Sequence, residues 1–167
     1  MGEASAGVGE GRFRVLAIDF RGFGQSKGPG QADLFSAPLH LDVLAAVRYL
    51  RKTGAKTVSV VGGSLGGEAA ADAAIEAEPG EIDRLVLLAA WANGPAEKIK
   101  GRKLFIVCRD DADDAGLRLP RIREQYEKAP DPKELVILEG SAHAQFIFAT
   151  DQGERLMAEI LRFLSAR

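Results

Sequence analysis

The stretch "VSVVGGSLGGEAAADAA", residues 58–74, places a β-branched apolar run before a glycine-rich turn and an alanine-rich segment after it. The apolar run is typical of a strand, and the alanines favour a helix. The turn "GGSLG" contains one serine, Ser64. The stretch therefore predicts a sharp strand-to-helix turn, and the rest of the chain must decide whether Ser64 is a nucleophile or only a turn residue.

Short apolar runs alternate with helical patterns on both sides of this stretch. Several runs are continuously apolar, as expected for strands covered on both faces. We therefore predict an α/β fold class: a mostly parallel sheet of about five strands flanked by helices, with ligands beyond the carboxyl ends of the strands. The expected strands are 14–19, 57–62, 84–90, 103–108 and 134–139, and the expected helices are about 41–50, 65–78, 117–128 and 152–166.

Length and composition limit the classes of function. The 167 residues suggest a single domain, 1–167, in which we expect 1–12 to be a flexible tail. A net charge of −2 without a basic cluster argues against a nucleic-acid partner, and no apolar run is long enough to cross a membrane. The single cysteine, Cys108, fits a reducing cytoplasm, and one cysteine with two histidines cannot form a common zinc site. We expect a cytoplasmic protein with no metal or cofactor.

The turn at Ser64 matches the pattern G-x-S-x-G, with the predicted strand before it and the predicted helix after it. Gly62 and Gly66 are expected to leave room where a Cβ would clash. The backbone N–H of Leu65 would lie at the start of the helix, where it can stabilise an oxyanion. The strand and helix around the motif strengthen the case for a nucleophile, but without a base and an acid elsewhere in the chain a plain turn serine would be the better interpretation.

Acidic residues and a histidine follow two later strands. The loop "CRDDADDAG", residues 108–116, contains four carboxylates, and "GSAHAQ" contains His143. A serine hydroxyl needs a base to take its proton, and a histidine can do so near neutral pH when a carboxylate fixes its tautomer. The order serine, aspartate, histidine, each just past a strand, predicts a Ser-His-Asp triad.

At this point the sequence resembles the α/β-hydrolase family, from about Phe13 to the C-terminus. The quoted elbow "VVGGSLGG", the strand and turn "LFIVCRDDAD" and the loop "LEGSAHAQF" look like the family's nucleophile, acid and histidine motifs. The stretch "RVLAIDFRGFGQSKGPG" looks like its Asp-x-Arg-Gly-x-Gly-x-Ser loop. The resemblance implies Ser64 as nucleophile, His143 as base and Asp111 as acid, with Asp110 as the alternative acid.

The resemblance also predicts a difficulty with the oxyanion hole. The family carries strands upstream of this loop, one of which ends in the loop that supplies the second oxyanion donor, and only about a dozen residues precede Phe13. We expect residues 14–19 to pair directly with 57–62, which would allow the N–H of Phe20 or Arg21 to be the second donor. Alternatively, a homo-oligomer could protect the shortened sheet.

These observations predict a serine hydrolase of carboxylic esters or related small acyl substrates. The alternative is a catalytically weak or inactive hydrolase-fold interaction module, or a truncated hydrolase. Asp19 and Arg21 are expected to brace their loop, and Cys108 is expected to be a small buried side chain.

Overall fold

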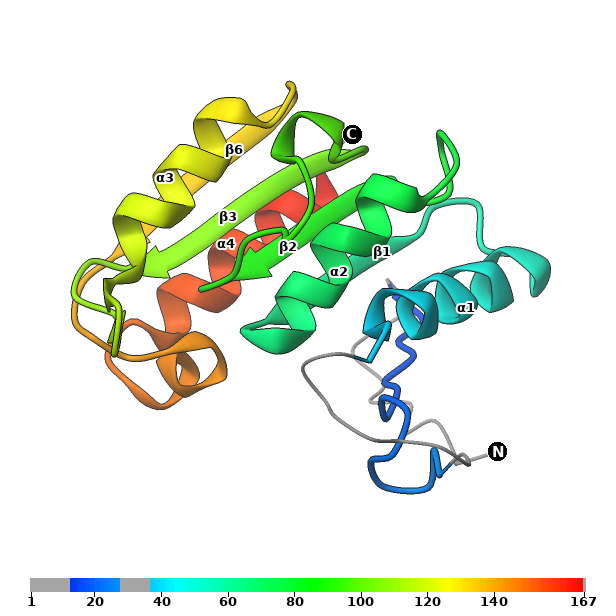
Figure 1. The fold of residues 1–167 in the computed structure, drawn as a ribbon, viewed down its shortest axis with the longest axis horizontal. Coiled ribbons are helices and arrows are strands. Elements are labelled where there is room, and N and C mark those ends of the chain that lie inside the picture. Colours follow the sequence, from blue (N-terminus) through cyan, green and yellow to red (C-terminus); the bar gives the residue numbers. More distant parts are fainter. Residues whose placement is uncertain (1–12, 28–36, 167) are drawn as a thin grey trace.

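A computed structural model describes residues 13–27 and 37–166 of the chain. Its centre is a parallel sheet in the order β1-β2-β3-β6, so the predicted α/β class is confirmed. The arrows in Figure 1 run in one direction, and this brings the loops after the strands to one edge. The strands are β1 (Ser59–Gly63), β2 (Arg84–Leu88), β3 (Arg102–Cys108) and β6 (Lys133–Leu138).

Helices cover both faces of the sheet, as Figure 1 shows. Helices α1 (Leu39–Lys52), α2 (Leu65–Glu76) and α3 (Arg118–Lys128) pack on one face. Helix α4 (Gly153–Ser165) packs on the other face, beside a 3₁₀ helix at Ala144–Ala149. A second short 3₁₀ helix, Ala96–Lys98, lies on the side of α2 and α3.

The central strands β2 and β3 are apolar on both faces because both faces are covered. Leu85 and Leu87 of β2 belong to the core under α1, α2 and α3, whereas Val86 and Leu88 belong to the core under α4. Side chains of successive strand residues point to opposite faces, so a strand between two helical layers needs apolar residues at every position. This explains the continuous apolar runs of the sequence.

The predicted strand at 14–19 is not formed. Residues 13–20 carry no strand pairing and are largely exposed, so the main sheet of the described residues has four strands rather than five. An apolar cavity of about 340 Å³ lies between residues 16–20, α1 and the outer edge of β1. The expected direct pairing of 14–19 with the serine strand is therefore wrong.

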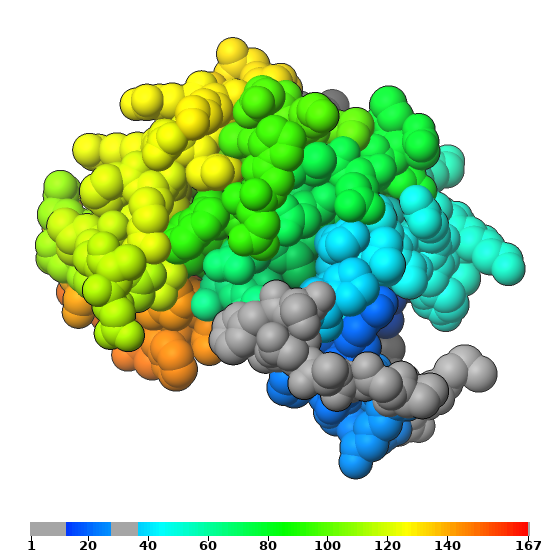
Figure 2. All heavy atoms as spheres, in the orientation of Figure 1, coloured from blue at the N-terminus to red at the C-terminus, as the bar shows by residue number. Residues whose placement is uncertain are grey.

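Residues 13–20 are held by helix α1 instead of by the sheet. The Arg14 guanidinium donates a 2.7 Å hydrogen bond to the Thr53 hydroxyl, just past the C-terminus of α1. Figure 2 shows this N-terminal segment at the margin of the molecule, next to α1. A run with strand-like sequence becomes a strand only when it pairs with a neighbouring strand, and here the cavity separates residues 16–20 from the free edge of β1.

A short hairpin lies beside the main sheet. A two-stranded hairpin, β4 (Ala112–Asp113) and β5 (Gly116–Leu117), joins β3 to α3 and was not predicted.

None of the helices in the described ranges is long and apolar enough to span a bilayer. The expected tail at 1–12 lies outside the described residues.

Candidate active site

Ser64 sits in the turn between β1 and α2 with strained backbone angles, φ 51° and ψ −129°. A positive φ is unfavourable for a residue with a Cβ, and such residues gather at functional sites. The turn is fixed by hydrogen bonds on both sides: the Ser64 N–H donates to the Leu88 carbonyl (2.9 Å), and the Gly67 N–H donates to the Ser64 carbonyl (2.8 Å). The predicted strained strand-to-helix turn is present.

Of the two glycines predicted to leave room around Ser64, Gly62 is tightly packed and Gly66 is not. A Cβ on Gly62 would lie 2.4 Å from the Gly66 carbonyl oxygen, so Gly62 is required for close packing. A Cβ on Gly66 would meet only the Phe20 ring, at an ordinary 3.8 Å. The second tight position is Gly67, where a Cβ would lie 2.4 Å from the Cβ of Ala90. The steric need attributed to Gly66 therefore belongs to Gly67.

Ser64, His143 and Asp111 form a continuous hydrogen-bonded chain. The distance from Ser64 Oγ to His143 Nε2 is 2.8 Å, and from His143 Nδ1 to Asp111 Oδ2 it is also 2.8 Å. A carboxylate can only accept, so Nδ1 carries the proton and Nε2 is left to accept the Ser64 hydroxyl. Asp111 is 1% exposed, whereas Asp110 is exposed and its N–H donates to the Gly140 carbonyl. The geometry therefore places Asp111, not Asp110, against the histidine.

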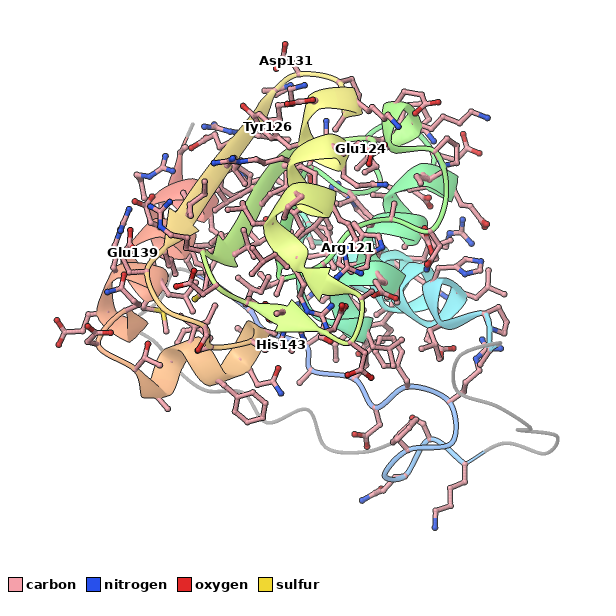
Figure 3. All side chains as sticks on the ribbon, turned by 60° about the vertical axis from the view of Figure 1, so that its left-hand side comes forward. Arg121, Glu124, Tyr126, Asp131, Glu139 and His143 are labelled. Carbon is pink, nitrogen blue, oxygen red and sulfur yellow. The ribbon has the colours of Figure 1, made fainter. Side chains whose placement is uncertain are left out.

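The three side chains come from loops at one edge of the sheet. Ser64 follows β1, Asp111 follows β3, and His143 lies in the loop between β6 and the 3₁₀ helix Ala144–Ala149. Figure 3 shows His143 at this edge and Asp131 at the opposite one. Ligands of such sheets bind beyond the carboxyl ends of the strands, so the chain of contacts lies where a binding site is expected.

The oxyanion donors differ from the prediction in one respect. Leu65 is the first residue of α2, so its N–H has no acceptor within the helix. The N–H of Arg21 donates to Asp42 Oδ2 (3.0 Å), and the Arg21 guanidinium pairs with the same carboxylate at 2.7 Å. Arg21 is thus a brace between its loop and α1, not an available donor. Phe20 remains a candidate because its ring lies beside Gly66.

Asp42 shows the strength of this brace. Burial alone would raise the pKa of the Asp42 carboxyl, but hydrogen bonds from the Arg21 side chain and backbone lower it on balance. Asp19 also acts within the loop, where it accepts a 3.3 Å hydrogen bond from the Gln25 N–H. The expectation that Asp19 and Arg21 brace the loop agrees with these contacts.

The surroundings of Cys108 and His40 indicate structural rather than catalytic roles. Cys108 is fully buried at the end of β3, and burial raises the pKa of its thiol. His40, in α1, lies 3.3 Å from Glu76, the last residue of α2. Within the described ranges, no group of three or more His, Cys, Asp or Glu side chains could hold a metal ion.

Two charged residues near the Ser64–His143–Asp111 contacts, Arg118 and Glu68, were not predicted from the sequence. Arg118, at the start of α3, lies with its Nε 3.4 Å from Asp111 Oδ1. Glu68, in the first turn of α2, has a carboxyl whose pKa is raised by burial and by Asp72, and lowered in part by Arg118, Asn93 and His143. No sequence motif marks these residues, because their proximity arises only when α2 and α3 pack on the same face of the sheet.

Comparison with known proteins agrees with the fold. Residues 4–126 match the sequence model of a family described as having the alpha/beta hydrolase fold; the match includes Ser64 and Asp111 and ends before His143. An esterase from Pyrococcus furiosus aligns over 92% of this chain and 71% of its own length, at 21% identity and a TM-score of 0.68.

Two further solved structures are similar. A CIB-like hydrolase from Thermoplasma acidophilum covers 86% of this chain and 69% of its own length, at 20% identity and a TM-score of 0.65. A dienelactone hydrolase from Anabaena variabilis aligns over 74% of this chain and 56% of its own length, at 25% identity and a TM-score of 0.57. The family match spans well over half of the sequence. The chain belongs to the family of proteins with the alpha/beta hydrolase fold.

Proposed function

We propose that the protein is a serine hydrolase that cleaves carboxylic esters or related small acyl compounds through a covalent acyl-enzyme. The observation that carries the proposal is the pair of 2.8 Å contacts from Ser64 Oγ to His143 Nε2 and from His143 Nδ1 to Asp111 Oδ2. A nucleophile within reach of a base that a third group orients is the arrangement that nucleophilic acyl transfer needs.

The proposed reaction has two steps. Ser64 Oγ attacks the ester carbonyl carbon while His143 takes the hydroxyl proton, and the histidine then gives that proton to the departing alcohol. A water molecule, deprotonated by His143, then attacks the acyl carbon, and the histidine returns that proton to Ser64 Oγ as the acid is released. Asp111 keeps the proton on Nδ1 and stabilises the imidazolium, and the Leu65 N–H stabilises the negative oxygen in both steps.

The length of one loop sets the expected substrate class. The loop between β2 and β3, residues 89–101, is short and leaves little chain for a lid. We therefore propose small, water-soluble esters rather than long-chain lipids. A cytoplasmic location and a homo-oligomeric state belong to the same proposal, from the single cysteine and the uncovered edge of β1.

The test is covalent labelling. The protein treated with a fluorophosphonate should carry the adduct on Ser64, located by mass spectrometry, and Ser64→Ala should remain unlabelled. Nitrophenyl esters of rising chain length should be hydrolysed fastest at short chain lengths. Asp111→Asn should lower kcat by about 10⁴-fold, because the histidine then adopts the wrong tautomer, while Asp110→Asn should keep nearly full activity. Turnover that survives Ser64→Ala would contradict the mechanism.

A second candidate function is a catalytically weak hydrolase-fold interaction module. The observation that favours it is the occupied N–H of Arg21, which leaves the second oxyanion donor without an assigned group apart from Phe20. Loss of one such donor lowers kcat by about 10²–10³-fold. A protein that labels slowly on Ser64 and turns over esters only marginally, with normal folding, would support this function.

A further inference from the structure

The carboxylate of Asp111 has two different partners, one on each oxygen. Oδ2 faces His143, and Oδ1 faces the guanidinium of Arg118 at 3.4 Å from Nε. The carboxylate is almost completely buried, at 1% exposure. An isolated buried charge is strongly unfavourable, so a cation on the oxygen that the histidine does not use is the obvious source of compensation.

Arg118 is held firmly in this place. Its backbone N–H donates to the Asp111 carbonyl (2.8 Å), its Nη2 lies 3.3 Å from Asp113 Oδ2, and its guanidinium lies 5.7 Å from the centre of the Trp91 ring. Its side chain is only 16% exposed, and among the described residues its buried Nε has no aligned hydrogen-bond acceptor. Nε thus contributes charge to Asp111 rather than a well-formed hydrogen bond.

The charged groups around Asp111 and His143 come from several elements. Asp111, in the loop after β3, bonds to His143, and Glu68 of α2 interacts with the same histidine electrostatically. Asp113 of the hairpin pairs with Arg118. The cations are Arg118 and Arg121, both from α3, and Arg121 pairs with Asp113 at 2.7 Å.

Arg118 is the cation that these carboxylates share. It pairs with Asp111 and Asp113 and also lowers the raised pKa of Glu68. Without Arg118, Asp111 would act on His143 with no cation on its other oxygen, and Glu68 would lose a charge that offsets it. Such a field stabilises the imidazolium, and a histidine that is already protonated cannot take a proton from Ser64.

We propose that Arg118 is a positioning residue, which anchors Oδ1 of Asp111 so that Oδ2 stays on His143 and whose positive charge offsets part of the negative charge that acts on the imidazole. The role of the base rests on the proposed function. The effect on the charge of His143 does not, because it can be measured in the absence of any substrate.

The test uses the fact that the chain has only two histidines, His40 and His143. NMR titration of the imidazole signals follows both, and His40 serves as an internal reference. In Arg118→Gln the midpoint of the His143 titration should rise by roughly half to one pH unit, because a nearby positive charge is lost. Arg118→Lys keeps the charge and should stay near the wild-type midpoint.

Arg121→Gln is the matched control. Arg121 shares Asp113 and the Trp91 ring with Arg118, at 4.6 Å from the ring centre, but makes no contact with Asp111. Its removal should move the His143 midpoint much less than Arg118→Gln does. If ester turnover is present, its acid limb should move to higher pH in parallel with the NMR midpoint, and kcat should fall more than KM changes.

Two outcomes would overturn the proposal: an unchanged His143 midpoint in folded Arg118→Gln, or an equal rise in Arg121→Gln. If Arg118→Gln does not fold, Arg118→Met keeps the apolar stem against Trp91 and allows the same comparison. Failure of the proposed function would look different. Ser64 of the wild-type protein would then remain unlabelled by a fluorophosphonate, whatever the histidine titration shows.

Discussion

Ser64 keeps an unfavourable backbone angle because its neighbours leave it no alternative. The residue at φ 51° is tied to Leu88 of β2 and to the first turn of α2 by backbone hydrogen bonds. A strained residue persists only where its surroundings determine its conformation. The close approach of α2 to the sheet therefore matters as much for the conformation of Ser64 as the hydrogen bonds do. Substitutions at Gly66 and Gly67 test this packing.

Gly67→Ala should destabilise the protein, and Gly66→Ala should not. The new Cβ at 67 would lie 2.4 Å from the Ala90 Cβ, which is fully buried and cannot move away. Overpacking of this kind costs about 1–3 kcal/mol. At 66 the nearest atom, in the Phe20 ring, is 3.8 Å away, and alanine is a better helix former than glycine by about 0.5–1 kcal/mol. Thermal unfolding of both variants checks this, and equal midpoints would contradict the packing argument.

At the scale of elements, the sequence was most informative where local pattern and tertiary contacts agree. The alanine-rich segment predicts α2 to within two residues of its C-terminal end, since Ala70, Ala73 and Ala74 are both good helix formers and fully buried. The run at 14–19 has an equally good strand pattern, but a strand forms only by pairing with a neighbour, and a cavity separates residues 16–20 from the free edge of β1.

The candidate site was predictable only in part, for the same reason. Ser64 and His143 are marked by their place after strands, and the pattern of the acid loop pointed to Asp111 over Asp110. The contact of Arg118 with Asp111 depends on the hairpin β4–β5, whose two-residue strands are too short to leave a periodic pattern in the sequence. Contacts set by packing between distant elements are not encoded locally.

Strand β3 contains an unusual buried lysine, which provides a prediction at this scale. Lys103 is 1% exposed, its Nζ donates to the Pro130 carbonyl at 2.6 Å, and burial lowers the pKa of its ammonium. Replacement by a side chain of similar length without charge removes the desolvation of this group, and the exposed Pro130 carbonyl can bond to water. Lys103→Met should therefore raise the free energy of unfolding by about 1–2 kcal/mol at pH 7.

The pH dependence of this gain follows from the sign of the shift. Between the lowered pKa of folded Lys103 and the ordinary value of 10.5, the unfolded chain binds more protons than the folded one. Wild-type stability gains from Lys103 as the pH rises through this window, so the advantage of Lys103→Met should shrink toward pH 10. Denaturant unfolding at a series of pH values measures it. A constant difference would show that Lys103 remains equally charged in both states.

At the scale of the whole molecule, the outer edge of β1 pairs with no strand among the described residues. β1 and β6 are the two outer strands of the sheet, and the free edge of β1 faces the 340 Å³ cavity that residues 16–20 and α1 line. Val61 of β1 is 48% exposed and Ile18 across the cavity is 39% exposed. An exposed apolar strand edge offers unpaired backbone groups to another chain, so this edge is where self-association should start.

A lysine in the middle of this edge should suppress such association. Val61→Lys adds a charge that an edge-to-edge contact would have to bury, and the exposure of Val61 lets the side chain reach water without disturbing the core. Sedimentation velocity at rising protein concentration should show less association than in wild type, with a similar thermal midpoint. Met157→Lys, at a 45% exposed position on α4, adds the same charge away from the edge and is the control. If both variants associate equally little, net charge rather than the β1 edge governs self-association.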